Sequence, residues 1–389
     1  MCTGRWNGRL SPSGEQGQAA KKVAPRDPDG IYVPRWDNKG FPRTDGGAEM
    51  NCTTYGLDIA KRVFQLYWVD QTNGEICNRK LGKQDLLEFF AQREAGLIAL
   101  EACGSAHWWR RELMALGHEV KLIHARFVRP FVQGNKTDAA DAKAIWTAIR
   151  QPGMRTVAGK TEEQQALLAL HRMRMSLIKF RTMQTNQLRG LLYEFGVTLK
   201  GGRQAGLAEI QQRMAELEEI VPGILFAAVK EQLKRLDEIE ADIQGIERRI
   251  KGWQKQQDAC RKIAEIPGVG LLSATAIVAT IGEAGSFKSG REFAAFIGLV
   301  PRQSGTGGKV KLLGISKRGD TYLRTLLIHG ARATLFRAKE KSAWSESLLQ
   351  RRPTNVAIVA MANKMARTAW AILAHGREYQ KGYVSQMPA

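Results

Sequence analysis

This sequence of 389 residues contains few cysteines, and none of them are spaced as zinc ligands or as a redox pair. The number of cysteines is odd, and they lie far apart along the chain. Both features argue against a disulfide framework and predict reduced thiols in a cytosolic protein. The positions are Cys2, Cys52, Cys77, Cys103 and Cys260.

The sequence also lacks an unbroken apolar run of the ~20 residues that a bilayer-spanning helix needs. Its N-terminus has basic residues without an apolar segment behind them, and neither end has a lipidation signal. These absences predict a cytoplasmic protein with no membrane partner.

Acidic residues are scarce relative to basic ones. The chain has 38 Asp and Glu residues against 59 Lys and Arg residues, which gives a formal net charge of +21. Such an excess of one sign repels itself unless a polyanion neutralises it. Nucleic acid is therefore the expected partner.

The chain length suggests two or three domains behind a poorly packed leading segment. Residues 1–49 hold eight glycines and five prolines but only five residues from Ile, Leu, Val and Phe, too few to build a core. We expect this extension to be disordered, with folded sequence beginning at Met50.

Residues 50–155 mix strand and helix patterns and predict an α/β domain. The expected strands cover residues 54–59, 62–70, 75–81, 96–101 and 119–123, and the expected helices cover 84–93, 106–116 and a segment that opens near residue 136.

Residues 156–256 predict a helical module, and residues 257–389 a mainly helical C-terminal domain. In the module, apolar residues recur at three- and four-residue steps, as in a coiled-coil seam. Packing of this seam within its own domain is the alternative to dimerisation. The seam residues are Val229, Leu233, Leu236, Ile239, Ile243, Ile246, Ile250 and Trp253.

Four acidic residues stand where an α/β sheet gathers its chemistry. Asp58 and Glu101 end predicted strands, and Asp138 and Asp141 begin a helix on one face of it. Converging carboxylates repel unless divalent cations neutralise them, and oxygen ligands suit Mg²⁺ or Mn²⁺. For the two helical acids taken singly, a first-turn role favoured by the helix dipole is the alternative.

The segment 298–324 combines a serine, glycines and basic side chains. Ser304 is followed by three glycines in the next four residues, which lets a bulky anion approach the backbone. A hairpin turn without catalytic function is the alternative. The basic residues that could donate to a phosphate are Arg302, Lys309, Lys311, Lys317, Arg318 and Arg324.

A second backbone-binding pattern precedes this segment. Pro267, Gly268 and Gly270 form an apolar-Pro-Gly-x-Gly turn ahead of a helix of small residues, similar to a helix-hairpin-helix motif that places N–H groups at a phosphate. A plain packing corner between two helices is the alternative.

Together these motifs resemble the IS110 family of insertion-sequence transposases, most closely its IS1111-like branch. The similarity runs from about Met50 to the C-terminus. It rests on Tyr55-Gly-Leu-Asp58-Ile-Ala-Lys, Glu101-Ala-Cys-Gly-Ser-Ala-His-Trp-Trp, Lys136-Thr-Asp138-Ala-Ala-Asp141-Ala, and the block from Gly298-Leu-Val-Pro-Arg to Gly330-Ala-Arg.

The resemblance implies an RNase H-like N-terminal domain similar to the RuvC Holliday-junction resolvase. It also implies that Asp58, Glu101, Asp138 and Asp141 form a metal-binding DEDD tetrad and that Ser304 is a nucleophile. Many IS1111-like sequences read Ser-Ser-Gly-Gly or Ser-Thr-Gly-Gly where this chain has Ser304-Gly-Thr-Gly-Gly. The hydroxyl of Thr306 therefore remains an alternative nucleophile.

The resemblance further implies a homo-oligomer, a dimer or a tetramer, that recombines donor and target DNA. The tetrad of one subunit and the serine of another would form a composite site, link DNA to the serine and pass through a strand-exchanged junction, guided by an RNA that the element encodes. A junction nuclease that uses metal-activated water is one rival, and a non-enzymatic nucleic-acid scaffold is the other.

Overall fold

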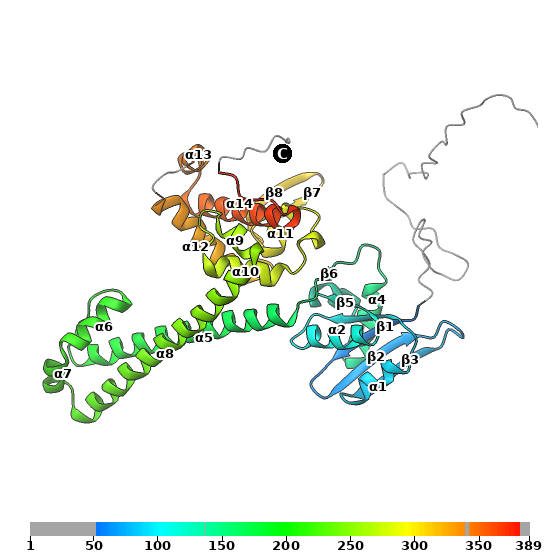
Figure 1. Ribbon diagram of the computed structural model, residues 1–389, viewed down its shortest axis with the longest axis horizontal. Coiled ribbons are helices and arrows are strands. Elements are labelled where there is room, and N and C mark those ends of the chain that lie inside the picture. The colour runs from blue at the N-terminus through cyan, green and yellow to red at the C-terminus, as the bar shows by residue number, and fades with distance from the viewer. Residues whose placement is uncertain (1–51, 136, 339–341, 382–389) are drawn as a thin grey trace, which may run out of the picture. The chain divides into compact units, whose positions relative to one another are not determined.

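The computed structural model describes residues 52–135, 137–338 and 342–381, and the predicted disordered extension lies outside them (Figure 1). The N-terminal part contains a six-stranded mixed sheet with the order β3-β2-β1-β4-β5-β6. Strands β1, β4 and β5 are parallel neighbours, whereas β2, β3 and β6 each run antiparallel to a neighbour. The strands are β1 (Thr54–Ile59), β2 (Val63–Val69), β3 (Ile76–Gly82), β4 (Leu97–Glu101), β5 (Glu119–Ile123) and β6 (Thr156–Val157).

This sheet and its helices are consistent with the RNase H-like domain that the sequence predicted. Five strands lie within a residue of their expected positions, and β6, just beyond the predicted domain end at residue 155, was not expected. The helices are α1 (Asp85–Ala91), α2 (Ala106–Ala115), α3 (Ala125–Val128), the 3-10 turn η1 (Arg129–Phe131) and α4 (Asp138–Ile149).

The helices cover both faces of the sheet, and β4 shows how the faces divide. Ile98 and Leu100 pack into the core formed with α1 and α2, whereas Ala99 packs with α4. Side chains alternate along a strand, so the α4 face also receives the side chain of Glu101.

Two long antiparallel helices dominate the helical module (Figure 1). Two ion pairs, Arg174–Glu247 and Arg181–Glu240, run along their contact. The apolar seam of the second helix packs on the first: Val229 and Leu236 share a core with Leu188. The partner helix of the seam is therefore in the same chain. The elements are α5 (Glu162–Glu194), α6 (Arg203–Gln212), α7 (Met214–Ile220) and α8 (Gly223–Gln256).

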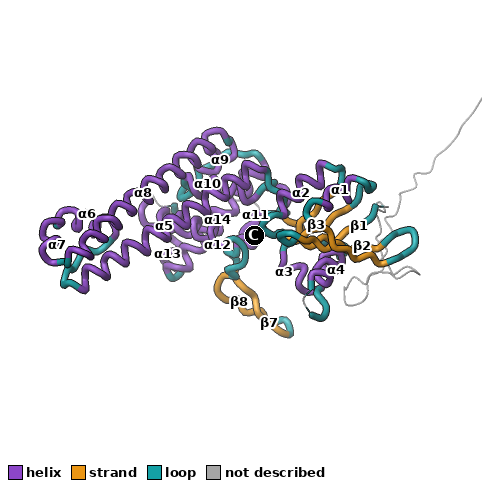
Figure 2. Tube along the Cα trace, turned by 90° about the horizontal axis from the view of Figure 1, so that it is seen from below, coloured by secondary structure: helices purple, strands orange, loops and turns teal. Residues whose placement is uncertain are grey.

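The C-terminal domain is mainly helical, as expected, and contains one β-hairpin that extends away from its helices (Figure 2). A single apolar core joins its helices. The elements are α9 (Asp258–Ala264), α10 (Leu271–Ile281), η2 (Ala284–Ser286), α11 (Gly290–Ile297), β7 (Pro301–Thr306), β8 (Lys309–Ile315), α12 (Thr321–Arg337), α13 (Ala343–Arg351) and α14 (Thr354–His375).

Helix α14 is the one described helix that is long and apolar enough to cross a membrane. Its sequence is interrupted by Asn363, Lys364 and Arg367, so it contains no unbroken apolar run of that length. Its apolar face, which includes Ile358 and Met361, is buried in the C-terminal core. Packing of a core helix accounts for its composition.

Candidate active site

Asp58 and Glu101 project from neighbouring parallel strands onto the same face of the sheet. They lie one residue beyond the paired Leu57 and Leu100 of β1 and β4. Both leucines are buried in the core on the α1 and α2 side. Because side chains alternate, both acids point to the opposite face, which α4 covers.

Gly56 allows α4 to lie directly on β1. A Cβ at this position would lie 2.6 Å from the backbone nitrogen of Trp146 and 2.7 Å from its Cβ. The indole Nε1 of Trp146 also donates a hydrogen bond to the carbonyl of Thr54, at 3.0 Å. The glycine between Tyr55 and Leu57 therefore sets how closely the helix approaches the strand that carries Asp58.

The start of α4 places two further acids near that strand. The Thr137 hydroxyl accepts a hydrogen bond from the Ala140 backbone at 3.2 Å and caps the helix, which begins at Asp138. Asp138 and Asp141 both lie in the first turn, where the helix dipole favours negative charge. The cap and the dipole explain why a helix can begin with two acids facing a third.

The four carboxylates interact electrostatically, as the pKa of Asp58 shows. Partial burial, and then repulsion from Asp141, Asp138 and Glu101 in that order, raise this pKa from 3.8 to about 6. All the charged groups that shift this pKa are therefore acids. The structure brings together the four residues that the sequence singled out.

These carboxylates fit a divalent cation in chemistry, although their side chains are not yet arranged around one. Within the described residues, no group of three or more acidic, histidine or cysteine side chains is close enough to hold a metal ion as it stands. An all-oxygen donor set with unrelieved repulsion is what a hard cation such as Mg²⁺ or Mn²⁺ neutralises.

Ser304 lies on the exposed hairpin formed by β7 and β8. Every residue of β7 is exposed. The two residues of the turn, Gly307 and Gly308, have φ angles of 57° and 79°, which suit a tight hairpin that demands positive φ. The glycine-rich segment is thus a hairpin that presents the serine to solvent.

The register of the hairpin places a lysine opposite each candidate nucleophile. Ser304 pairs with Lys311, and Thr306 pairs with Lys309. Directly opposed residues share one face of the ladder, so each hydroxyl has an ammonium group beside it. The hairpin gives the two hydroxyls similar surroundings and does not choose between them.

The other predicted phosphate ligands divide into exposed and buried groups. Arg302, Lys317 and Arg318 are exposed. Arg324 is only 8% exposed, and its guanidinium donates to the carbonyls of Ile297 and Arg318. These donors hold the base of the hairpin, and a contact of Arg324 with DNA stays a prediction.

The Pro-Gly turn between α9 and α10 has both a packing role and an exposed edge. A Cβ on Gly268 would lie 2.5 Å from the carbonyl oxygen of Gly330, so this glycine lets the turn pack on α12. Pro267 and Gly270 are exposed, and Gly270 precedes the first turn of α10 without a side-chain cap. Gly268 serves packing, while the neighbouring N–H groups remain available to an anion.

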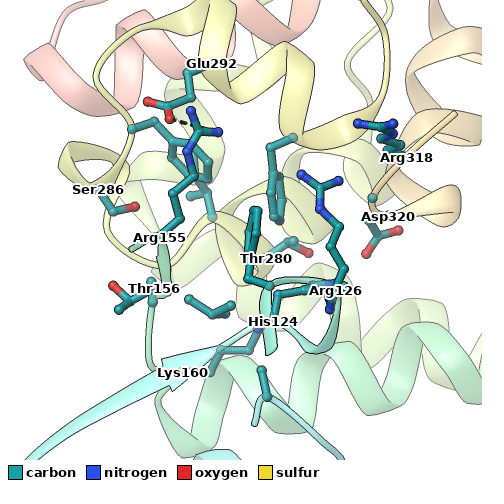
Figure 3. Close-up of a pocket in the computed structure, with 18 of the residues that line it drawn as sticks. His124, Arg126, Arg155, Thr156, Lys160, Thr280, Ser286, Glu292, Arg318 and Asp320 are labelled. Carbon is teal, nitrogen blue, oxygen red and sulfur yellow. Dashed lines mark hydrogen bonds and ion pairs between the residues drawn. The ribbon is translucent and has the colours of Figure 1, made fainter. Parts of the chain in front are cut away.

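A large cavity of about 2280 Å³ begins beyond the end of β4 and reaches the C-terminal domain. Nine lysine or arginine residues line it, against four aspartate or glutamate residues. Ser304 and the four acids are not among the lining residues. In Figure 3, Arg155 pairs with Glu292, and Arg126, Lys160 and Arg318 face the same space.

Sequence reasoning missed this basic cavity. Its lining comes from segments such as those around His107, Lys160 and Arg318, which are far apart in the chain. Each has an ordinary local composition, and only the high net charge hinted that such a surface exists.

Comparison with known proteins is consistent with this arrangement. A transposase family model of the IS110 DEDD type matches residues 55–196, and the model of the transposase IS116/IS110/IS902 family matches residues 260–345. A "Probable family 20 transposase" of Pseudomonas aeruginosa is 45% identical over 338 residues, covering 86% of this chain and 100% of the relative.

Two further relatives are transposases of named insertion sequences. The transposase for insertion sequence element IS1111A of Coxiella burnetii is 41% identical and covers 84% of this chain and 91% of its own. The transposase for insertion sequence element IS1328 of Yersinia enterocolitica is 36% identical, with coverage of 85% and 99%.

Proposed function

The chain belongs to the IS110 family of insertion-sequence transposases and acts on DNA, and from this we propose that it recombines DNA through a covalent link to Ser304. The observation that carries the proposal is the gathering of four acids from three elements, where burial and then mutual repulsion raise the pKa of Asp58. Acids are gathered in this way where cations will bind.

In this proposal Asp58, Glu101, Asp138 and Asp141 hold Mg²⁺ or Mn²⁺. Such ions, when bound, stabilise the charge on the attacking and leaving oxygens of a phosphodiester. A bound cation offsets the cost of burying the carboxylate charges and also their mutual repulsion. Both effects therefore favour cation binding.

The oxygen of Ser304 forms an ester bond with the phosphorus of the scissile phosphodiester. The bond from phosphorus to the deoxyribose oxygen breaks, and that oxygen leaves as a hydroxyl with the serine proton. Attack by a hydroxyl of another strand reverses the step and rejoins DNA. The ammonium group of Lys311 beside Ser304 stabilises the serine oxygen as it loses its proton. It also stabilises the negative charge that develops on the phosphate.

The composite site is proposed to join the acids of one subunit to the serine of another in a homo-oligomer. The full exposure of β7 supports this assignment, because the strand is free to reach a second chain. Donor and target choice by an element-encoded RNA is compatible with the charge of +21.

The finer assignments of the fold belong to the same proposal. The Pro267 turn would contact a DNA backbone as a helix-hairpin-helix does, and the α5–α8 pair would serve as a coiled-coil module. The uncapped start of α10 supports the first, and the ion-paired seam supports the second.

The experiment that tests the chemistry looks for protein-linked DNA. The purified protein, its co-purifying RNA and supercoiled donor and target plasmids are incubated with Mg²⁺ and analysed under denaturing conditions. We expect a covalent product with the wild type, none with Ser304→Ala, and a mild defect with Thr306→Ala. The reverse pattern would move the nucleophile to Thr306.

The acids provide the second arm of that experiment. Asp58→Ala, Glu101→Ala and Asp138→Ala should each abolish recombination and leave nucleic-acid binding largely intact, because these residues do not supply the positive field. Cleavage by Ser304→Ala and Thr306→Ala alike would favour the rival junction nuclease, in which water attacks and Ser304 only contacts phosphate.

A further inference from the structure

In the large cavity, the side chains of His107 and Lys160 approach each other as two hydrogen-bond donors that share no acceptor. The backbone N–H of Lys160 donates to Nδ1 of His107, at 3.3 Å. The Nζ of the same lysine lies 3.2 Å from Nε2 of the same ring. The lysine therefore contacts both ring nitrogens, one through its backbone and one through its side chain.

The donor and acceptor roles in this contact do not match. Because Nδ1 of His107 accepts a hydrogen bond, the hydrogen of the neutral ring is on Nε2. The Lys160 ammonium group has only donors. Two donors thus approach within hydrogen-bonding distance with no acceptor between them. An oxygen atom that accepts from both would satisfy the pair.

The groups around this pair are mostly positively charged, and few acidic groups balance them. Burial, and then the charges of Lys160, Arg111 and Arg110, lower the pKa of His107 from 6.5 to about 4. Burial also lowers the pKa of Lys160, and Asp320 opposes that shift. Within the described residues Lys160 forms no salt bridge. The Asp320 carboxylate accepts the Leu323 N–H as a helix cap.

The geometry of the pair is held by two arginines of α2. Arg111 donates to the carbonyl oxygen of Lys160, at 3.1 Å. The guanidinium of Arg110 lies over Gly159, where a Cβ would not fit. The backbone position of Lys160 is therefore fixed by α2, and its side chain opens on the cavity.

We propose that His107 and Lys160 form a binding site for one backbone phosphodiester of a nucleic acid strand in the large cavity. A phosphodiester oxygen accepts from Nε2–H and from the ammonium group together, and the charge on phosphate offsets the local positive charge. The site rests on the proposed function for its ligand, but it lies apart from Ser304 and the four acids.

Lys160→Met tests the site, with Lys234→Met as a matched control on exposed α8. Full-length protein carrying Ser304→Ala is titrated in EDTA with a duplex of the element end and, separately, with the co-purifying RNA, over a range of salt. We expect Lys160→Met to weaken binding of one of them about tenfold and to reduce the salt slope by about 0.9 for a duplex or about 0.7 for a single strand.

The two arms identify the strand, because only the one held by the site loses affinity. Lys160→Arg should restore the salt slope, since it keeps the charge. Lys234→Met should leave both quantities unchanged. Unaltered affinity and slope for both ligands in Lys160→Met would overturn the proposal.

Folding provides an independent readout. Lys160→Met should melt no lower than the wild type, because the lysine has no acceptor in the free protein, whereas a lysine that stabilises the fold would lower the melting temperature. In the wild type, nucleic acid should protect the Lys160 amine from acylation, and equal labelling with and without it would contradict the site. Since no step here needs catalysis, failure of the serine chemistry leaves this test intact.

Discussion

The pKa of Asp58 reports the burial and the electrostatic repulsion within the acidic site. Its folded-state pKa of about 6 exceeds the ordinary 3.8, so the folded protein binds this proton more tightly than the unfolded chain does. The resulting stabilisation is present at low pH and is lost as the pH rises through about 6. At neutral pH without metal, Asp58 therefore opposes folding.

A metal titration tests this balance. In EDTA at pH 7, we expect Asp58→Asn to melt at a higher temperature than the wild type, because it removes a repelled charge. Added Mg²⁺ should raise the melting temperature of the wild type more than that of Asp58→Asn, since it binds only the folded site. Asp237→Asn, on the exposed face of α8, is the control for charge removal. Equal Mg²⁺ shifts in wild type and Asp58→Asn would exclude Asp58 as a ligand.

His171 joins the helical module to the C-terminal domain through two hydrogen bonds. It is only 1% exposed, with Nδ1 2.9 Å from the hydroxyl of Tyr322 and Nε2 3.1 Å from that of Thr275. Burial, and then the charge of Arg174, lowers its pKa from 6.5 to about 4. The folded protein therefore keeps this ring neutral.

This burial predicts a loss of stability in mild acid. The contribution of neutral His171 is complete above pH 6.5 and declines as the pH falls toward 4, by at most about 1.4 kcal/mol per pH unit. Urea unfolding between pH 7.5 and 4.5 should show a shallower decline for His171→Gln than for the wild type. His329→Gln, at an exposed position of α12, should follow the wild type. Parallel curves for all three proteins would show that His171 does not titrate on unfolding.

At the scale of elements, the seam of α8 is used within the chain. Ile250 is fully buried in a cluster with Leu167 of α5 and Ala279 of α10. The periodic sequence implied a partner helix, and α5 supplies it through ion pairs as well as apolar contacts.

Ile250→Ala should therefore cost folding stability. We expect a loss of about 2–5 kcal/mol, because the substitution leaves a cavity, with no change in the mass of the particle in solution. Urea unfolding together with light scattering measures both, and Lys251→Ala at the exposed neighbouring position is the control. A change of oligomeric state with little loss of stability would instead indicate that this seam joins subunits.

At the scale of the whole molecule, the first 49 residues are the part that the sequence predicts to be dispensable. They contain few large apolar residues from which to build a core. A chain beginning at Met50 should melt and recombine like the full-length protein. A melting temperature several degrees lower, or lost recombination, would show that the segment contributes to the fold or to the reaction.

Local sequence alone determined much of this protein. Strand positions, the helix that begins with Asp138, the tight Gly307 turn and the family resemblance all come from patterns within short windows. Such patterns are readable because hydrophobic period, turn chemistry and helix caps depend on neighbouring residues.

Tertiary structure decided what those elements meet. It put Asp58 and Glu101 on the α4 face through strand register, turned Arg324 inward as a structural residue, and gave the α8 seam a partner in the same chain. It also joined His107 to Lys160 across 53 positions. These outcomes depend on packing between distant segments, where a side chain's role follows from its burial and its partners. No local pattern in the sequence specifies the burial of a side chain or its partners.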